Sequence, residues 1–337
     1  MRKDRKKLIT IAFILILALF VSSIVSGFPV NLLIKDNYAE AGNTTSVEGE
    51  VSAIDAYIEE GRKLFESGKY LQALEKYNKA LELAPEEASL YLERGKVYLA
   101  FEKLEDALKD FGQAIRLDKN LIEAYAMRGS TYILLMNWEK ALEDFNTVLE
   151  VEPENVTVLA FQAQANQRLG NFTRALKDWE KVERLTGGNA EIRYNMGNIY
   201  FSMGNLEKAV AEWNKAIALD PKRPDIYINR GIAQSQRGKW QEALRDFEKA
   251  LALGGDKGIV YNSLGHIHFQ LKNYQKAIDN YTKALKFIPE NPLIYFSRGI
   301  AYRNVGNSAA ALADFRKAVR LNADFLEAYV NKAGANL

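Results

Sequence analysis

The stretch from Tyr91 to Asp118 reads YLERGKVYLAFEKLEDALKDFGQAIRLD. Arg94 and Gly95 stand in its first half, and Asp110 follows the arginine by sixteen residues. The same arrangement returns further along the chain. It is therefore either a chemical site that recurs or a part of how a repeated unit folds.

The surrounding sequence repeats every 34 residues without insertion or deletion. Eight copies fit, and we number the positions within each copy from 1 to 34. The predicted repeats are 54–87, 88–121, 122–155, 156–189, 190–223, 224–257, 258–291 and 292–325.

A few positions of the repeat are nearly invariant along the chain. Position 8 is glycine in every copy except the fourth, which has Ala163, and position 20 is alanine in all eight. Position 24 is always aromatic, and position 32 is proline in half of the copies. By helical period, positions 4, 8 and 11 share one stripe of a first helix, and positions 20, 24 and 27 share one stripe of a second. Small residues at 8 and 20 allow the two helices to approach closely, and the aromatic ring fills the space beside them.

These residues resemble the tetratricopeptide repeat (TPR) family over the whole of 54–325. The resemblance implies an all-α fold, a right-handed α-solenoid of helix-turn-helix hairpins. It also implies a concave groove, lined mostly by first helices, that receives a peptide or a helix of another protein. Residues 326–337 are similar to the first helix of a ninth repeat, and we expect them to form a C-terminal capping helix.

Positions 7 and 23 vary together. Where position 7 is arginine, position 23 is aspartate, and the first repeat exchanges the charges with Glu60 and Lys76. Such covariation indicates a direct contact across the hairpin, and a bidentate pair of this kind stabilises the fold. The predicted structural ion pairs are Arg94 with Asp110, Arg128 with Asp144, Arg230 with Asp246, and Arg298 with Asp314.

If position 7 is used internally, a partner must contact other positions of the first helices. Asparagine can donate to and accept from an extended backbone, and aromatic groups can anchor it. The alternative is that these residues pack one repeat on the next or form a solvated face. The predicted groove residues are Leu92, Lys96, Leu99, Met127, Tyr194, Asn195, Asn198, Phe201, Ile228, Asn229, Asn262, His266, Phe269 and Phe296.

Composition excludes several other functions. Lys plus Arg is 45 and Asp plus Glu is 43, so the whole chain lacks the basic surplus typical of nucleic-acid binding. Cysteine is absent, and His266 and His268 are two residues apart, so a helix points them in different directions. We found no phosphate-binding loop or nucleophile elbow. The sequence therefore predicts a protein that is not an enzyme and has no catalytic residue, cofactor, metal site or small-molecule substrate.

The N-terminal segment predicts export. Five basic residues within 2–7 precede eighteen mostly apolar residues from Leu8 to Val25, which are enough to span a bilayer with the N-terminus in the cytoplasm. Residues 1–34 are then either a signal anchor or a signal peptide cleaved near Ala41, and 35–53 form a flexible linker. The repeats would lie on the extracytoplasmic side, on a membrane anchor or secreted, most simply in a bacterial envelope.

Together these features favour a scaffold that binds protein or peptide partners and assembles an envelope complex. Two alternatives stay open. One is a targeting or regulatory subunit of a separate enzyme. The other is a self-associating structural element.

Overall fold

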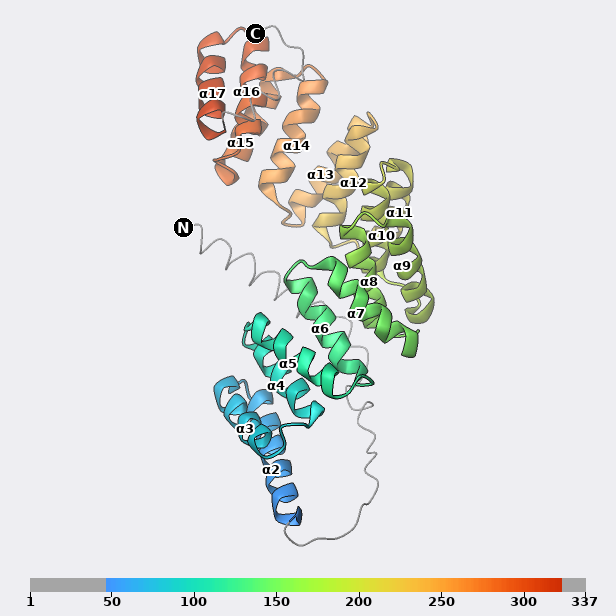
Figure 1. The fold of residues 1–337 in the computed structure, drawn as a ribbon. Coiled ribbons are helices and arrows are strands. Elements are labelled where there is room, and N and C mark those ends of the chain that lie inside the picture. Colours follow the sequence, from blue (N-terminus) through green and yellow to red (C-terminus); the bar gives the residue numbers. More distant parts are fainter. Residues whose placement is uncertain (1–46, 323–337) are drawn as a thin grey trace. The chain divides into compact units, whose positions relative to one another are not determined.

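The computed structural model describes residues 47–322, with side chains from Ala53 onward, and this part of the chain is entirely helical outside its turns. Within each of its compact units, consecutive helices form antiparallel pairs, and these pairs stack one after another (Figure 1). The described chain divides between Ala165 and Asn166 into two compact units. The predicted all-α TPR solenoid is thereby confirmed at the level of helix pairs and their stacking.

The helices follow the repeat. In the first unit they are α2 (Val47–Glu66), α3 (Tyr70–Leu83), α4 (Ala88–Ala100), α5 (Leu104–Leu117), α6 (Ile122–Leu134) and α7 (Trp138–Val151), followed by α8 (Val156–Arg168), in which the division falls. In the second unit they are α9 (Phe172–Thr186), α10 (Ala190–Ser202), α11 (Leu206–Leu219), α12 (Pro224–Gln236), α13 (Trp240–Ala252), α14 (Lys257–Gln270), α15 (Tyr274–Phe287), α16 (Pro292–Asn304) and α17 (Ser308–Leu321).

The turn inside each hairpin depends on position 15, which adopts the left-handed backbone conformation in all eight repeats. Five repeats place glycine there, and Glu102, Met136 and Lys272 adopt the same conformation with φ of 57–58°. The next N–H then bonds back to the carbonyl of position 11, as from Lys103 N to Tyr98 O at 2.9 Å. This turn reverses the chain within a few residues, so the second helix packs against the first.

The core of each hairpin is the contact between positions 8, 20 and 24. Ala107 and Phe111 of α5 are fully buried beneath Gly95 of α4. A methyl group on Gly95 would lie 2.6 Å from the Phe111 ring, well inside van der Waals contact. The same close approach recurs at Gly129, Gly197, Gly265 and Gly299. Glycine at position 8 therefore sets the distance between the two helices of a hairpin.

The boundary of the first helix differs from expectation. Helix α2 begins at Val47, so residues 47–53, which we assigned to the linker, belong to this helix. No proline stands between Val47 and Ile54, so the helix can extend backwards from the repeat.

The predicted N-terminal membrane or signal segment 1–34, residues 35–46 and the capping helix 326–337 lie outside the described residues. No helix between residues 47 and 322 is long and apolar enough to cross a membrane.

Candidate functional site

The repeated arginine and aspartate meet across each hairpin. Arg94 donates from Nε and Nη2 to the two carboxylate oxygens of Asp110, both at 2.7 Å. The Asp110 side chain is 8% exposed, and the hydrogen bonds raise the pKa of Arg94 above its usual value. The other three pairs have the same bidentate geometry at 2.6–2.9 Å: Arg128 with Asp144, Arg230 with Asp246, and Arg298 with Asp314.

The arginines also connect neighbouring repeats, which the sequence did not lead us to expect. Nη1 of Arg94 donates to Asn78 Oδ1 of the preceding repeat at 2.8 Å. Arg230 reaches Asn214 in the same way at 2.6 Å, and Arg298 reaches Thr282 at 3.0 Å. Each guanidinium also lies 5.5–5.6 Å from the ring of the tyrosine at position 4. With every face of the guanidinium engaged, position 7 holds the solenoid together and has little capacity left for a ligand.

Arg128 is the exception, because Gly112 stands where its neighbour should supply an acceptor. A Cβ on Gly112 would meet nothing closer than Arg128 Nη1 at 4.0 Å. We expect Gly112→Asn to stabilise the chain by roughly 1 kcal/mol, through helix propensity and a new bond to Arg128. Gly112→Ala is the control for thermal or urea unfolding. Asn is a weaker helix former than Ala by roughly 0.6 kcal/mol. If the Asn variant were less stable than the Ala variant by that full amount in the free energy of unfolding, the hydrogen bond to Arg128 would not form.

Repeats without this arginine use other partners. In the first repeat Lys76 pairs with Glu60, as the exchanged charges indicated. In the fifth, Glu212 pairs with Arg193 from position 4 at 2.9 Å. In the fourth, Asp178 accepts a hydrogen bond from a neutral donor, Asn166 Nδ2, at 3.0 Å.

Burial raises the pKa of Asp178, and this predicts a distinct pH dependence. A carboxyl group whose pKa is higher in the folded state favours folding below its unfolded pKa and loses that contribution as the pH rises through the folded value. At pH 7 the ionised Asp178 therefore opposes folding. We expect Asp178→Asn to be neutral or stabilising by up to about 1 kcal/mol at pH 7, with the difference from wild type shrinking toward pH 4. Urea unfolding at several pH values measures this, and a loss above 2 kcal/mol at pH 7 would contradict it.

Three predicted groove residues are instead in the core. Leu92, Ile228 and Phe296, all at position 5, are 3–8% exposed. The glycine at position 8 leaves room for the aromatic ring at position 24, and position 5 packs beside that ring. Phe296 lies 5.5 Å from Phe315 between ring centroids, and Leu92 and Ile228 cluster with Phe111 and Phe247. Position 5 with a large apolar side chain therefore packs within its own hairpin, whereas the alternative to a groove was packing of one repeat on the next.

Several other predicted groove side chains are engaged by neighbours within their own unit. Lys96 forms ion pairs at 2.7 Å with Glu93 and with Glu123 of the next repeat. Leu99 and Met127 pack on the core of the second repeat. Phe201 lies 5.8 Å from Trp213, and Phe269 lies 5.4 Å from Tyr274. Lys96 and Met127 thus join neighbouring repeats, whereas the contacts of Leu99, Phe201 and Phe269 lie within their own repeats.

The asparagines of the fifth and sixth repeats form a network of their own. Asn229 Nδ2 donates to Tyr194 Oη and to Asn198 Oδ1, each at 3.1 Å. Asn195 donates to Glu191 at 3.2 Å. Burial raises the pKa of Tyr194, whose ring lies 4.7 Å from the Arg223 guanidinium. The amide hydrogens of Asn229 are thus used between α12 and α10, and Asn195 donates within α10.

An open pocket of about 330 Å³ lies further along the second unit, across three successive first helices. Two aromatic residues of second helices, Phe247 and Tyr281, are part of its lining. The remaining lining residues are Ile232, Ser235 and Gln236 of α12, Asn262, Ser263 and His266 of α14, and Leu293 and Ser297 of α16. Of the predicted groove residues, Asn262 and His266 are in this pocket, while the three serines were not predicted.

The pocket is free of charge. Its lining contains no Lys, Arg, Asp or Glu, and desolvation lowers the pKa of His266, which is therefore neutral at pH 7. Hydroxyl and amide groups supply both donors and acceptors, and Ile232 and Leu293 supply apolar contact. This combination suits an extended, uncharged segment. Within residues 47–322 no group of three His, Asp or Glu side chains is placed to hold a metal ion.

Comparison with known families agrees with this geometry. A TPR repeat model matches residues 61–100, 197–236 and 265–306. Further tetratricopeptide repeat models match 88–121, 127–190, 224–254 and 293–325. The chain belongs to the tetratricopeptide repeat family. No curated protein matches the sequence of this TPR protein significantly.

Solved structures with the same fold come from varied sources. A tetratricopeptide repeat protein from Parabacteroides merdae has a TM-score of 0.57 and 22% identity, covering 74% of this chain and 99% of that one. The C-terminal part of a TPR repeat-containing protein from Cytophaga hutchinsonii has a TM-score of 0.58 and 19% identity, covering 71% and 98%. A chain of the APC/C hetero-tetramer Cut9–Hcn1 has a TM-score of 0.53 and 16% identity, covering 82% and 55%.

At sequence identities of 16–22%, the similarity to these solved structures shows the fold alone. The TPR repeats and their similar structures support a protein-protein interaction scaffold. Which surface binds, and what it binds, must be argued from this chain's own residues.

Proposed function

We propose that this TPR protein is a non-enzymatic scaffold that binds an extended peptide segment of another protein in the pocket of repeats six to eight. The observation that carries the proposal is the uncharged lining from α12, α14 and α16. These are first helices, the elements that line the concave groove in the TPR family. Elsewhere along the first helices, the candidate groups are buried or paired with neighbours.

The lining also indicates what kind of segment fits. A carboxylate or ammonium group placed here would lose water without gaining an opposite charge, which is costly. Ser297 and Asn262 can instead exchange hydrogen bonds with backbone amides, and Leu293 can contact an apolar side chain. The Ser263 hydroxyl donates to Ile259 O at 2.9 Å and can accept a hydrogen bond from a backbone N–H. The ligand is therefore an internal stretch of uncharged residues, and a charged C-terminal tail is disfavoured.

The location belongs to the same proposal. The basic and apolar N-terminal sequence supports export, with the repeats outside the cytoplasmic membrane, either anchored or released after cleavage near Ala41. There the scaffold would help to assemble an envelope complex. The Cut9–Hcn1 hetero-tetramer illustrates that a chain of this fold can be part of a stable assembly.

Quantitative pull-down tests the pocket. The full chain in a non-ionic detergent is used as bait on solubilised membranes of its own cells, and bound proteins are counted by mass spectrometry. We expect Ser263→Arg with Ser297→Arg to lower recovery of specific partners at least about tenfold, because the guanidinium groups fill an uncharged pocket. The control is Gln241→Arg, an exposed residue of α13. Equal recovery by all three baits, with equal thermal stability, would contradict the proposal.

A further inference from the structure

The near-zero charge of the chain conceals two units of opposite charge. Residues 47–165 hold 13 Lys and Arg against 23 Asp and Glu, a formal charge of −10. Residues 166–322 hold 25 against 15, a formal charge of +10. Self-repulsion of this size costs stability within each unit, and a surface of opposite charge would relieve it.

The positive charge of the second unit collects along one edge of its stack. Because the helices of every hairpin are antiparallel, the turns within repeats all lie along the same edge. Positions 12–17 of repeats four to eight form what we call the basic edge, and they contain no Asp or Glu. Met203 and Val305 add exposed apolar groups there. Its cations are exposed: Arg168, Arg237, Lys239, Lys272 and Arg303.

The negative charge of the first unit collects along the other edge of its stack, where the turns between successive repeats lie. Positions 29–34 of repeats one to three form what we call the acidic edge, with two cations, Arg116 and Lys119. None of its carboxylates is in an ion pair within the described residues. Leu83, Leu117 and Val151 of this edge are exposed, Val151 to 61%. The carboxylates are Glu82, Glu86, Glu87, Asp118, Glu150, Glu152 and Glu154.

We propose that the basic edge docks onto the acidic edge of a second copy of this chain. The two edges carry formal charges of +5 and −5, and both expose apolar side chains between the charges. An anionic lipid surface would complement the basic edge alone and would repel the acidic unit. A second copy complements both edges at once, because each molecule supplies one of each. The inference does not rest on the peptide pocket. Ser235 and Gln236 belong to both the pocket lining and the basic edge, but the cations that carry the inference do not line the pocket.

Charge-reversal variants test whether the basic edge pairs with the acidic edge. Self-association of the full chain in an uncharged detergent is measured by sedimentation velocity. Wild type is expected to self-associate at low salt and to dissociate as ionic strength rises. One variant reverses the basic edge with Arg237→Glu, Lys239→Glu, Lys272→Glu and Arg303→Glu. The other reverses the acidic edge with Glu82→Lys, Glu86→Lys, Glu150→Lys and Glu154→Lys. Each variant alone should associate about tenfold or more weakly, and an equimolar mixture should recover association, because opposite edges then meet again.

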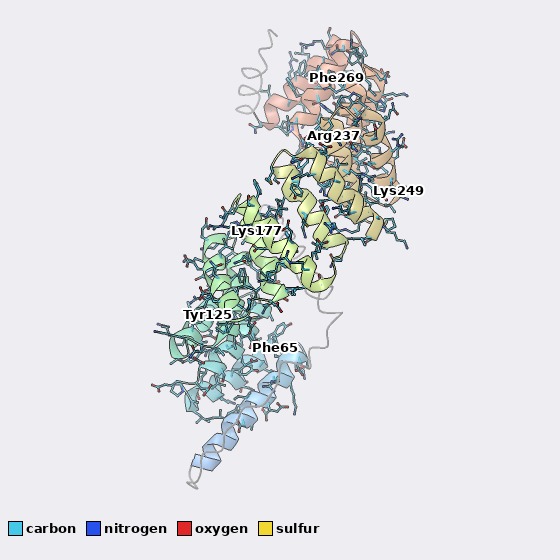
Figure 2. The ribbon with its side chains drawn as sticks, turned by 90° about the vertical axis from the view of Figure 1, so that its right-hand side faces the viewer. Phe65, Tyr125, Lys177, Arg237, Lys249 and Phe269 are labelled. Atoms are coloured by element: carbon cyan, nitrogen blue, oxygen red, sulfur yellow. The ribbon has the colours of Figure 1, made fainter. Side chains whose placement is uncertain are left out.

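The matched control keeps the net charge of the first variant but changes other surfaces: Arg245→Glu, Lys249→Glu, Lys286→Glu and Arg316→Glu. Figure 2 labels Arg237 of the basic edge and Lys249 of the neighbouring second helix. Retained association of the control supports the edge. Equal loss in the control, monomeric wild type at low salt, or no recovery in the mixture would each overturn the proposal. Binding of wild type to phosphatidylglycerol vesicles without self-association would overturn it in favour of a membrane surface.

Discussion

Replacing Arg230 by Met is expected to lower the free energy of unfolding by about 3–5 kcal/mol, because it leaves a buried carboxylate without its counter-ion. The Asp246 side chain is 7% exposed and accepts two hydrogen bonds from Arg230 at 2.6 and 2.9 Å. The variant also loses the bond from Arg230 to Asn214 of the preceding repeat. Urea unfolding followed by circular dichroism measures the change.

The double variant Arg230→Met with Asp246→Leu separates the two causes. Removing both charges should cost clearly less than removing the arginine alone, since no unpaired carboxylate remains. Arg245→Met changes an exposed arginine of the same hairpin and should stay within about 0.5 kcal/mol of wild type. If the single variant at Arg230 were as stable as this control, the ion pair would not have the structural role given to it here.

Phe145→Ala is expected to cost about 3–5 kcal/mol, because this ring is fully buried between the helices of the third hairpin. Its partner Gly129 leaves no room for a side chain, since a Cβ there would lie 2.6 Å from the ring. Gly129→Ala should therefore destabilise by roughly 1–3 kcal/mol despite the better helix propensity of alanine.

Gly112 provides a matched control for the expected destabilisation by Gly129→Ala. Gly112 is also helical but faces open space, so Gly112→Ala should stabilise the chain by roughly 1 kcal/mol. Both variants are compared by thermal unfolding. Stabilisation by both substitutions would show that position 8 does not set the distance between helices.

The repeat itself could be predicted from sequence because its determinants are local and recur eight times. A fixed period of 34 residues located every helix pair, and covariation between positions 7 and 23 identified partners that the structure places 2.6–2.9 Å apart. The left-handed backbone conformation at position 15 could also have been predicted, since five repeats have glycine there. The other three repeats give no such signal, because Glu102, Met136 and Lys272 adopt that conformation at a cost in conformational energy.

The binding surface was harder to predict because helical period gives the direction of a side chain but not its partners. Position 5 lies beside the aromatic ring of the hairpin, so Leu92 and Phe296 are core residues although the period allowed them to face a groove. Asn229 had the right chemistry for a backbone ligand, but Tyr194 and Asn198 accept both of its amide hydrogens. Such competition between a ligand and a neighbouring repeat depends on distances across the stack.

Charge illustrates a third limit. A net charge of +2 for the whole chain indicated that it lacks the basic surplus typical of nucleic-acid binding. Only the division between Ala165 and Asn166 shows which residues to sum, and the two units then differ by twenty formal charges. A domain boundary is therefore needed before net charge can indicate a partner.

Site-specific photocrosslinking tests most directly whether the uncharged pocket of repeats six to eight is the binding surface. A photoreactive phenylalanine analogue replaces Ser263 of α14 in one chain and Glu248, an exposed residue of α13, in another. After irradiation of living cells, we expect a discrete protein adduct from position 263 that Ser297→Arg abolishes, and no such adduct from position 248. Adducts of equal yield from both positions, or from position 248 alone, would contradict the account.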